Sequence, residues 1–135
     1  MTENNFSILV VDDQNGVRRL LYEVFIDEGY RVRMASGGSE ALKLVSQEMP
    51  DMVLLDIKMP GMTGLETLSE LRKINSDLLV LIMTAYGDLE VVGQAKKLGV
   101  KHYIVKPFDL NEVRHLVKGL LYESGPKKGQ YQEIG

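Results

Sequence analysis

The sequence predicts an α/β protein built on a parallel β-sheet of five strands, with helices on both faces of the sheet. Short apolar runs alternate with amphipathic segments along the chain, which is the order expected of successive strand–helix units. The runs at residues 8–11, 52–55 and 79–83 are apolar without interruption, a pattern typical of strands buried on both faces. At 135 residues the chain has the length of one domain. We expect that domain to span residues 1–122, followed by a mobile tail at 123–135 that has almost no apolar content.

The two remaining strands have different characters. Residues 31–35 alternate polar and apolar side chains, which favours a more exposed strand at the edge of the sheet, and residues 102–105 form a short fifth strand. Five strand–helix units joined by right-handed crossovers give a doubly wound, three-layer fold. We expect the flavodoxin-like strand order 2-1-3-4-5, in which a binding site forms beyond the carboxyl ends of the strands.

The first two helices are predicted from the spacing of apolar residues. One buried face of the first helix, which Gly29 ends, comprises Val17, Leu20, Leu21, Val24 and Phe25. The second helix extends over residues 38–48, directs Ala41, Leu42 and Val45 inward, and is followed by Pro50.

The last three helices are predicted from their starting residues. Thr63 and Glu66 form a capping box that opens the third helix, and Asp88 is expected to cap the fourth. Asp109 and Glu112 begin the fifth helix. The inward residues are Leu65, Leu68 and Leu71 in the third helix, and Leu110, Val113, Leu116, Val117 and Leu120 in the fifth.

Composition narrows the classes of function. The net charge of −3, with both signs mixed along the chain, argues against direct nucleic-acid binding, which needs a dense basic surface. The absence of cysteine excludes disulfides and thiolate metal sites and fits a reducing compartment. The N-terminus does not resemble a signal peptide, and the longest apolar stretch, 78–83, is far shorter than the roughly 20 residues that span a membrane. We expect a cytoplasmic protein that does not contact membranes.

Polar side chains end four of the predicted strands. Asp12 and Asp13 follow the first strand, and Asp56, Thr84 and Lys106 end the third, fourth and fifth. Each has an ordinary structural explanation: Asp often caps a helix or occupies a turn, Thr is a common strand residue, and a Lys before Pro is usually a solvated strand end. Their joint occurrence at the carboxyl edge of one sheet indicates a site instead.

The chemistry of this group indicates phosphoryl transfer. Three carboxylates about 5 Å apart repel one another by roughly 3 kcal/mol per pair, a conflict that a divalent cation and Lys106 would remove. Carboxylate oxygens suit Mg²⁺, with Mn²⁺ as a possible substitute, and Mg²⁺ usually completes its shell with phosphate oxygens. We expect Asp12 and Asp13 to hold the metal and Asp56 to be the nucleophile that becomes phosphorylated. Lys106 and Thr84 would contact phosphoryl oxygens.

Four motifs carry a resemblance to a known family. VVDD at residues 10–13, LLDIKMPGMTG at 54–64, MTA at 83–85 and VKPF at 105–108 resemble, in order and separation, the receiver domain of two-component response regulators. The resemblance covers residues 8–121. It implies phosphorylation of Asp56 by a histidine kinase, Mg²⁺ ligation by Asp56 and by the Lys58 carbonyl, a cis bond before Pro107, and a switch formed by Thr84 and Tyr103. It also implies a protein that catalyses its own phosphorylation and dephosphorylation without turning over an external substrate.

A closer likeness is to the stand-alone receivers of sporulation phosphorelays, which pass phosphoryl groups between a histidine kinase and a phosphotransferase. Asn15 and Tyr103 depart from that pattern and leave the identity of the partner open. We expect a stand-alone receiver, monomeric or weakly dimeric. A partner histidine must approach the phosphorylated residue, so the rim of the site is the expected docking surface. The candidate rim residues are Gln14, Val17, Arg18, Leu21, Lys58, Tyr86, Pro107 and Phe108.

Three alternatives remain open. The chain could be the receiver of a longer DNA-binding regulator. A magnesium-dependent phosphatase with an Asp nucleophile would usually carry Asp-x-Asp after one strand, whereas this chain has adjacent Asp12 and Asp13 and a separate Asp56. A flavin-binding protein would need a phosphate loop after the first strand, where these two carboxylates would repel a phosphate.

Overall fold

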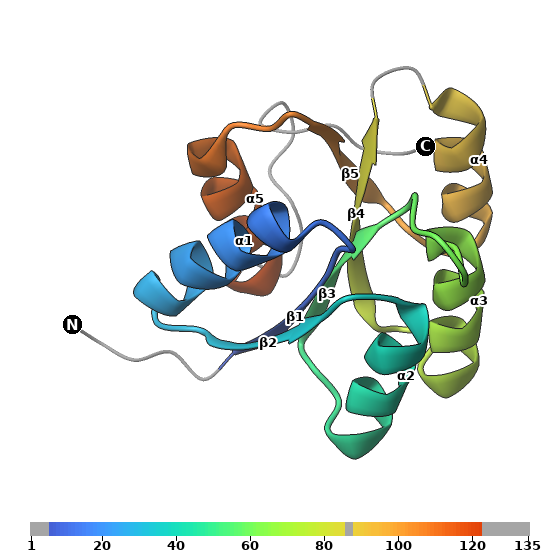
Figure 1. Ribbon diagram of the computed structural model, residues 1–135, viewed down its shortest axis with the longest axis horizontal. Helices are drawn as coiled ribbons and strands as arrows, with labels where there is room; N and C mark the ends of the chain where they lie inside the picture. Colours follow the sequence, from blue (N-terminus) through green and yellow to red (C-terminus); the bar gives the residue numbers. More distant parts are fainter. Residues whose placement is uncertain (1–5, 86–87, 123–135) are drawn as a thin grey trace.

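The fold is a five-stranded parallel sheet between two layers of helices, as a computed structural model shows for residues 6–85 and 88–122 (Figure 1). The strands are β1 (Ser7–Val11), β2 (Arg31–Ala35), β3 (Met52–Asp56), β4 (Leu79–Ala85) and β5 (His102–Lys106). Their spatial order is β2-β1-β3-β4-β5, which confirms the predicted order and places the more exposed β2 at an edge. The expected tail at 123–135 and Tyr86 lie outside the described residues. In the part of the chain described, no helix has the length and apolar character needed to cross a membrane.

Helices cover both faces of the sheet (Figure 1). The helices α1 (Asn15–Asp27) and α5 (Leu110–Tyr122) pack on the face formed by Ile8, Val10, Met52, Leu54, Leu81 and Met83. The helices α2 (Gly38–Gln47), α3 (Gly64–Ile74) and α4 (Leu89–Lys97) pack on Leu9, Val11, Val53, Leu55, Val80 and Ile82. Successive residues of each central strand therefore enter opposite cores, which explains why their sequences are apolar without interruption.

The helix ends confirm most of the predicted signals. Thr63 accepts a hydrogen bond from the Glu66 amide while Glu66 returns one to Thr63, so the capping box is present. The carboxylate of Asp109 accepts bonds from the amides that open α5. The prediction for Asp88 is wrong: it precedes α4, but its side chain makes no capping bond and lies 3.4 Å from Lys58 Nζ instead. Its ψ of 54° differs from the extended ψ of 166° at Thr63, so its side chain is not aimed at the helix amides.

The predicted inner face of α1 is wrong at one position. Leu21 and Phe25 are fully buried, and Val17 and Val24 pack partly against the same core. Leu20, in contrast, is 46% exposed. At about 100° per residue, Leu20 lies roughly 120° from the midpoint between Leu21 and Phe25, outside the stripe that faces the sheet.

Candidate functional site

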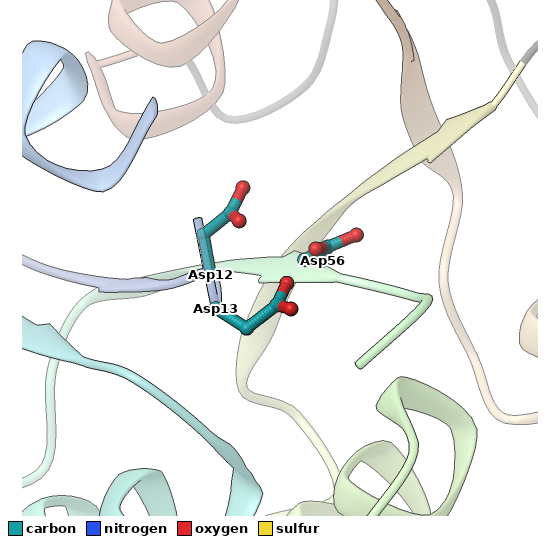
Figure 2. Close-up of side chains that lie close together, drawn as sticks. All are labelled: Asp12, Asp13 and Asp56. Atoms are coloured by element: carbon teal, nitrogen blue, oxygen red, sulfur yellow. The ribbon is translucent and has the colours of Figure 1, made fainter. Parts of the chain in front are cut away.

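The strand register brings the predicted site residues to one edge of the sheet. Val11 of β1 pairs with Leu55 of β3, so the next residues along both strands, Asp12 and Asp56, lie side by side. Ala85 of β4 pairs with Lys106 of β5, which places the lysine at the same edge. Figure 2 shows the carboxylates of Asp12, Asp13 and Asp56 gathered beyond the ends of β1 and β3.

The three carboxylates form a compact group. Each offers an oxygen, and these atoms all lie within 4.8 Å of one another. Asp12 is fully buried and Asp56 is 5% exposed, whereas Asp13 is open to solvent. Buried carboxylates are costly unless they are paired or coordinate a cation, and an all-oxygen donor set suits a hard divalent ion. The residues therefore fit Mg²⁺ in the chemistry of their donor atoms.

Lys106 supplies positive charge to this group. Its Nζ lies 2.8 Å from Asp12 Oδ2 and 3.4 Å from Asp56 Oδ2, and it also donates to Gln14 Oε1 at 3.3 Å. The side chain starts on β5 and reaches past β4 and β3 to β1, a span that only a long side chain covers. The ammonium group therefore faces both Asp12 and Asp56, where it can neutralise charge that develops on either.

Asp56 is the carboxyl group whose protonation the site perturbs most clearly. Burial and then the charge of Asp12 raise its pKa from 3.8 to about 6, with Asp13 adding to the rise. Lys106 and the Lys58 amide, which donates to Asp56 Oδ1 at 3.2 Å, act in the opposite direction. Their combined effect is too small to offset burial and repulsion. The carboxylates of the site therefore carry more negative charge than Lys106 neutralises.

The backbone after β3 is held closely against α3. The Gly64 amide donates to the Ile57 carbonyl at 3.1 Å, and a Cβ at Gly64 would lie 2.4 Å from both the Asp56 carbonyl oxygen and Ile57 Cα. Only a glycine permits this approach. The peptide bond between Lys106 and Pro107 is cis, as predicted. Sequence reasoning included Gly64 in the motif but assigned it no role.

Thr84 and Tyr103 share a face of the sheet. Tyr103 pairs with Ile82, and side chains two residues apart along a strand point the same way, so Thr84 is the diagonal neighbour of the tyrosine on the α4 side. The Tyr103 ring is partly buried against the core of that side. Thr84 is 2% exposed, and among the residues that the structure describes its hydroxyl makes one long contact, of 3.5 Å, with the Ala85 carbonyl. The hydroxyl can thus donate to another acceptor near Asp56.

The predicted docking rim needs one correction. Leu21 is fully buried and cannot contact a partner, whereas its neighbour Leu20 is exposed. Gln14, Lys58 and Pro107 are exposed, Val17, Arg18 and Phe108 are partly buried, and Tyr86 lies outside the described residues. The apolar spacing of α1 alone could not separate Leu20 from Leu21, since both fit an i, i+3, i+4 pattern.

Comparison with known proteins gives a consistent result. The profile of the response regulator receiver domain matches residues 8–118. Over 117 residues the chain is 49% identical to the sporulation initiation phosphotransferase F of Bacillus subtilis (strain 168), covering 87% of this chain and 94% of that relative. It is 40% identical over 121 residues to the regulatory protein AtoC of Escherichia coli (strain K12), covering 90% of this chain but only 26% of AtoC.

Solved structures show the same fold. A CheY-like receiver domain protein of Methanospirillum hungatei JF-1 superposes with a TM-score of 0.84 at 29% identity, covering 89% of this chain and 96% of that one. The chemotaxis protein CheY4 of Vibrio cholerae superposes with a TM-score of 0.81 at 27% identity, covering 85% and 98%.

Proposed function

The chain belongs to the response regulator receiver domain family, and from that premise we propose that Asp56 accepts and carries a phosphoryl group. The observation that carries this proposal is the convergence of Asp12, Asp13, Asp56 and the Lys106 ammonium group at one edge of the sheet. Asp56 is the candidate nucleophile because it ends a central strand and lies within reach of Lys106. It also has no second carboxylate next to it in sequence.

The proposed reaction needs few groups. A carboxylate oxygen of Asp56 attacks phosphorus, a P–O bond forms, and the P–N bond to a partner phosphohistidine breaks with its electron pair moving to the imidazole nitrogen. Lys106 neutralises negative charge on a phosphoryl oxygen, and the Thr84 hydroxyl donates a hydrogen bond to another. The nucleophile is the ionised form of Asp56, so nearby positive charge that lowers the pKa of Asp56 increases the fraction of protein able to react.

Asp12, Asp13, Asp56 and the carbonyl of Lys58 would hold Mg²⁺, for which Mn²⁺ could substitute. The ion would supply positive charge to the phosphoryl oxygens and to the acidic residues. The compact carboxylate group and the raised pKa of Asp56 support this assignment, because both indicate negative charge that Lys106 does not fully offset. The carbonyl of Lys58 enters only from family resemblance.

We propose that phosphorylation is signalled through Thr84 and Tyr103. Their shared face beside α4 supports this pairing, since a shift of Thr84 toward Asp56 would change the space available to the ring. Coupling of this kind is usually worth about 1–3 kcal/mol, enough to shift a population of conformations.

The similar proteins indicate the kind of signalling pathway in which the chain acts. The sporulation relative matches over nearly its whole length, which favours a stand-alone phosphorelay intermediate with a histidine kinase and a histidine phosphotransferase as partners. The docking surface would comprise Gln14, Val17, Arg18, Leu20, Lys58, Pro107 and Phe108. We further propose a cytoplasmic, monomeric or weakly dimeric protein that binds neither DNA nor membranes and turns over no external substrate. A second candidate, the receiver of a longer regulator, is favoured by the match to AtoC over 26% of its length.

Intact-mass measurement after incubation with a small phosphodonor and Mg²⁺ tests the central proposal. Wild type should gain one phosphoryl group, EDTA should prevent the gain, and Asp56→Asn should abolish it. Asp27→Asn is the matched control, because Asp27 is an exposed residue at the end of α1 and should leave the adduct unchanged. An unmodified wild type, or an adduct that persists in Asp56→Asn, would overturn the assignment. Hydrolysis of an external phosphomonoester in many-fold excess over protein would favour the phosphatase alternative.

A further inference from the structure

Arg18 is oriented toward the backbone of the site instead of outward. It lies in the first turns of α1, and its Nη1 donates to the carbonyl oxygen of Asp12 at 2.6 Å. Its Nη2 hydrogen-bonds Asn15 Oδ1. A guanidinium group offers donors in a fixed planar fork, so two acceptors together fix its orientation. Arg18 is therefore held by hydrogen bonds within the protein itself.

The carbonyl that Arg18 contacts belongs to the peptide linking two of the proposed metal ligands. The two ends of that peptide are the Cα atoms of Asp12 and Asp13, from which the two carboxylate side chains extend. Displacement of this peptide would therefore move both carboxylates. A hydrogen bond from a charged donor at 2.6 Å is among the stronger ones in proteins, so Arg18 opposes such displacement.

The rest of Asp12 is already held by other partners. Its amide donates to the Ala35 carbonyl at 3.2 Å, its Oδ1 accepts from the Gln14 amide at 2.9 Å, and its Oδ2 accepts from Lys106 at 2.8 Å. Gln14 occupies the N-cap of α1 without a side-chain capping bond, and the first turn of this helix has no acidic residue. The turn from β1 into α1 thus lacks the usual side-chain cap. The hydrogen bond from Arg18 to the Asp12 carbonyl connects the helix to the end of the strand instead.

We propose that Arg18 is a positioning residue for the metal-binding carboxylates, acting through the Asp12–Asp13 peptide. The inference rests on the proposed function, because it assumes that Asp12 and Asp13 hold a divalent ion. It goes beyond the docking role expected from sequence, since it assigns Arg18 an effect that needs no partner protein. Groups that orient metal ligands typically change metal affinity about 10- to 100-fold when removed.

Titration of the unphosphorylated protein with MgCl₂ by calorimetry tests this inference. Arg18→Ala should raise the Kd for Mg²⁺ about tenfold, the low end of the range because the contact is made to the ligand backbone. Arg18→Lys should recover part of the loss, since an ammonium group can donate one of the two bonds. Arg19→Ala is the matched control: its side chain is 71% exposed and contacts Glu23 on the same helix, so the Kd should not change.

Phosphorylation by a small phosphodonor provides the second measurement. The Arg18→Ala rate should fall at low Mg²⁺ and approach the wild-type rate when the metal is saturating. Because helix α1 could be weakened, Asn15→Ala serves as a second variant: it removes the acceptor that orients Arg18, and it should raise the Kd less than Arg18→Ala does. Thermal unfolding in EDTA checks that each variant is folded.

These measurements distinguish a failure of the positioning role of Arg18 from a failure of the proposed function. If wild type binds Mg²⁺ and Arg18→Ala has the same Kd and the same small-phosphodonor rate, the positioning role is wrong and Arg18 acts only in docking. If wild type itself neither binds Mg²⁺ nor becomes phosphorylated, the proposed function fails.

Discussion

Replacement of Gly64 by alanine should disturb the proposed phosphorylation site through the backbone. The added Cβ would lie 2.4 Å from the Asp56 carbonyl oxygen and from Ile57 Cα, whereas real Cβ atoms stay at least 3.0 Å from such atoms. The backbone of Asp56 and Ile57 must therefore retreat by at least about 0.6 Å in a close-packed region. Neither obstacle is the end of a flexible side chain, so rotation about χ angles cannot relieve the overlap.

The size of the effect follows from this overlap. Overpacking a core costs about 1–3 kcal/mol, and a backbone obstacle places Gly64→Ala near the upper limit. For a domain of this length, about 3 kcal/mol corresponds to a fall in Tm of roughly 10 °C. Because Asp56 would move with its backbone, phosphorylation by a small phosphodonor should slow at least about tenfold under folded conditions.

A graded series of glycine variants tests this reasoning by thermal unfolding and intact mass. At Gly38 a Cβ would meet side-chain atoms, Thr67 Oγ1 and Met62 Sδ, so Gly38→Ala should be intermediate. At Gly93, in α4, it would meet nothing within 4 Å, so Gly93→Ala should be neutral or stabilise by about 0.5–1 kcal/mol. Equal unfolding temperatures and phosphorylation rates for Gly64→Ala and Gly93→Ala would refute the steric argument.

Two further predictions concern the acidic group and α1. In EDTA, the contribution of Asp56 to wild-type stability should decrease as pH rises from about 4 through 6, because the folded pKa of Asp56 is raised to about 6 and its carboxyl group is then ionised at a cost in the native state. Asp56→Asn should remove this dependence. At pH 7.5 it should be more stable than wild type by about 1–2 kcal/mol after allowance for solvent screening. Urea unfolding measures this difference in stability, and added Mg²⁺ should reduce it. Leu21→Ala should cost about 2–5 kcal/mol and Leu20→Ala less than about 0.5 kcal/mol, since Leu21 is fully buried and Leu20 is 46% exposed. Similar urea midpoints for the two leucine variants would contradict the observed orientation of α1.

Sequence reasoning was most successful where a local pattern has one physical explanation. The uninterrupted apolar strands indicated a sheet covered on both faces, and the observed division of Ile8 and Val10 from Leu9 and Val11 between two cores confirms it. The capping box at Thr63 formed as expected, because its two hydrogen bonds involve residues only three apart.

It failed where the outcome depends on a distant neighbour. Asp88 has the right residue type to cap α4, but Lys58, thirty positions earlier, takes its carboxylate, and the local ψ directs the side chain away from the helix amides. Leu20 and Leu21 both fit the apolar period of α1, and only the direction from which the sheet approaches the helix determines which of them is buried.

The sequence by itself determined the order of the strands and helices, the motifs, and the residue types that end the strands, because these depend on spacing and side-chain chemistry along the chain. Only the tertiary structure decided how those ends meet: the parallel register sets Asp12 beside Asp56, and Lys106 reaches past β4 to Asp56 and past β3 to Asp12. The tertiary structure also determines that Arg18 donates to the Asp12 carbonyl and that Gly64 lies close to the backbone of Asp56. These contacts depend on how closely separate elements pack against one another, which no local pattern of residues along the chain encodes.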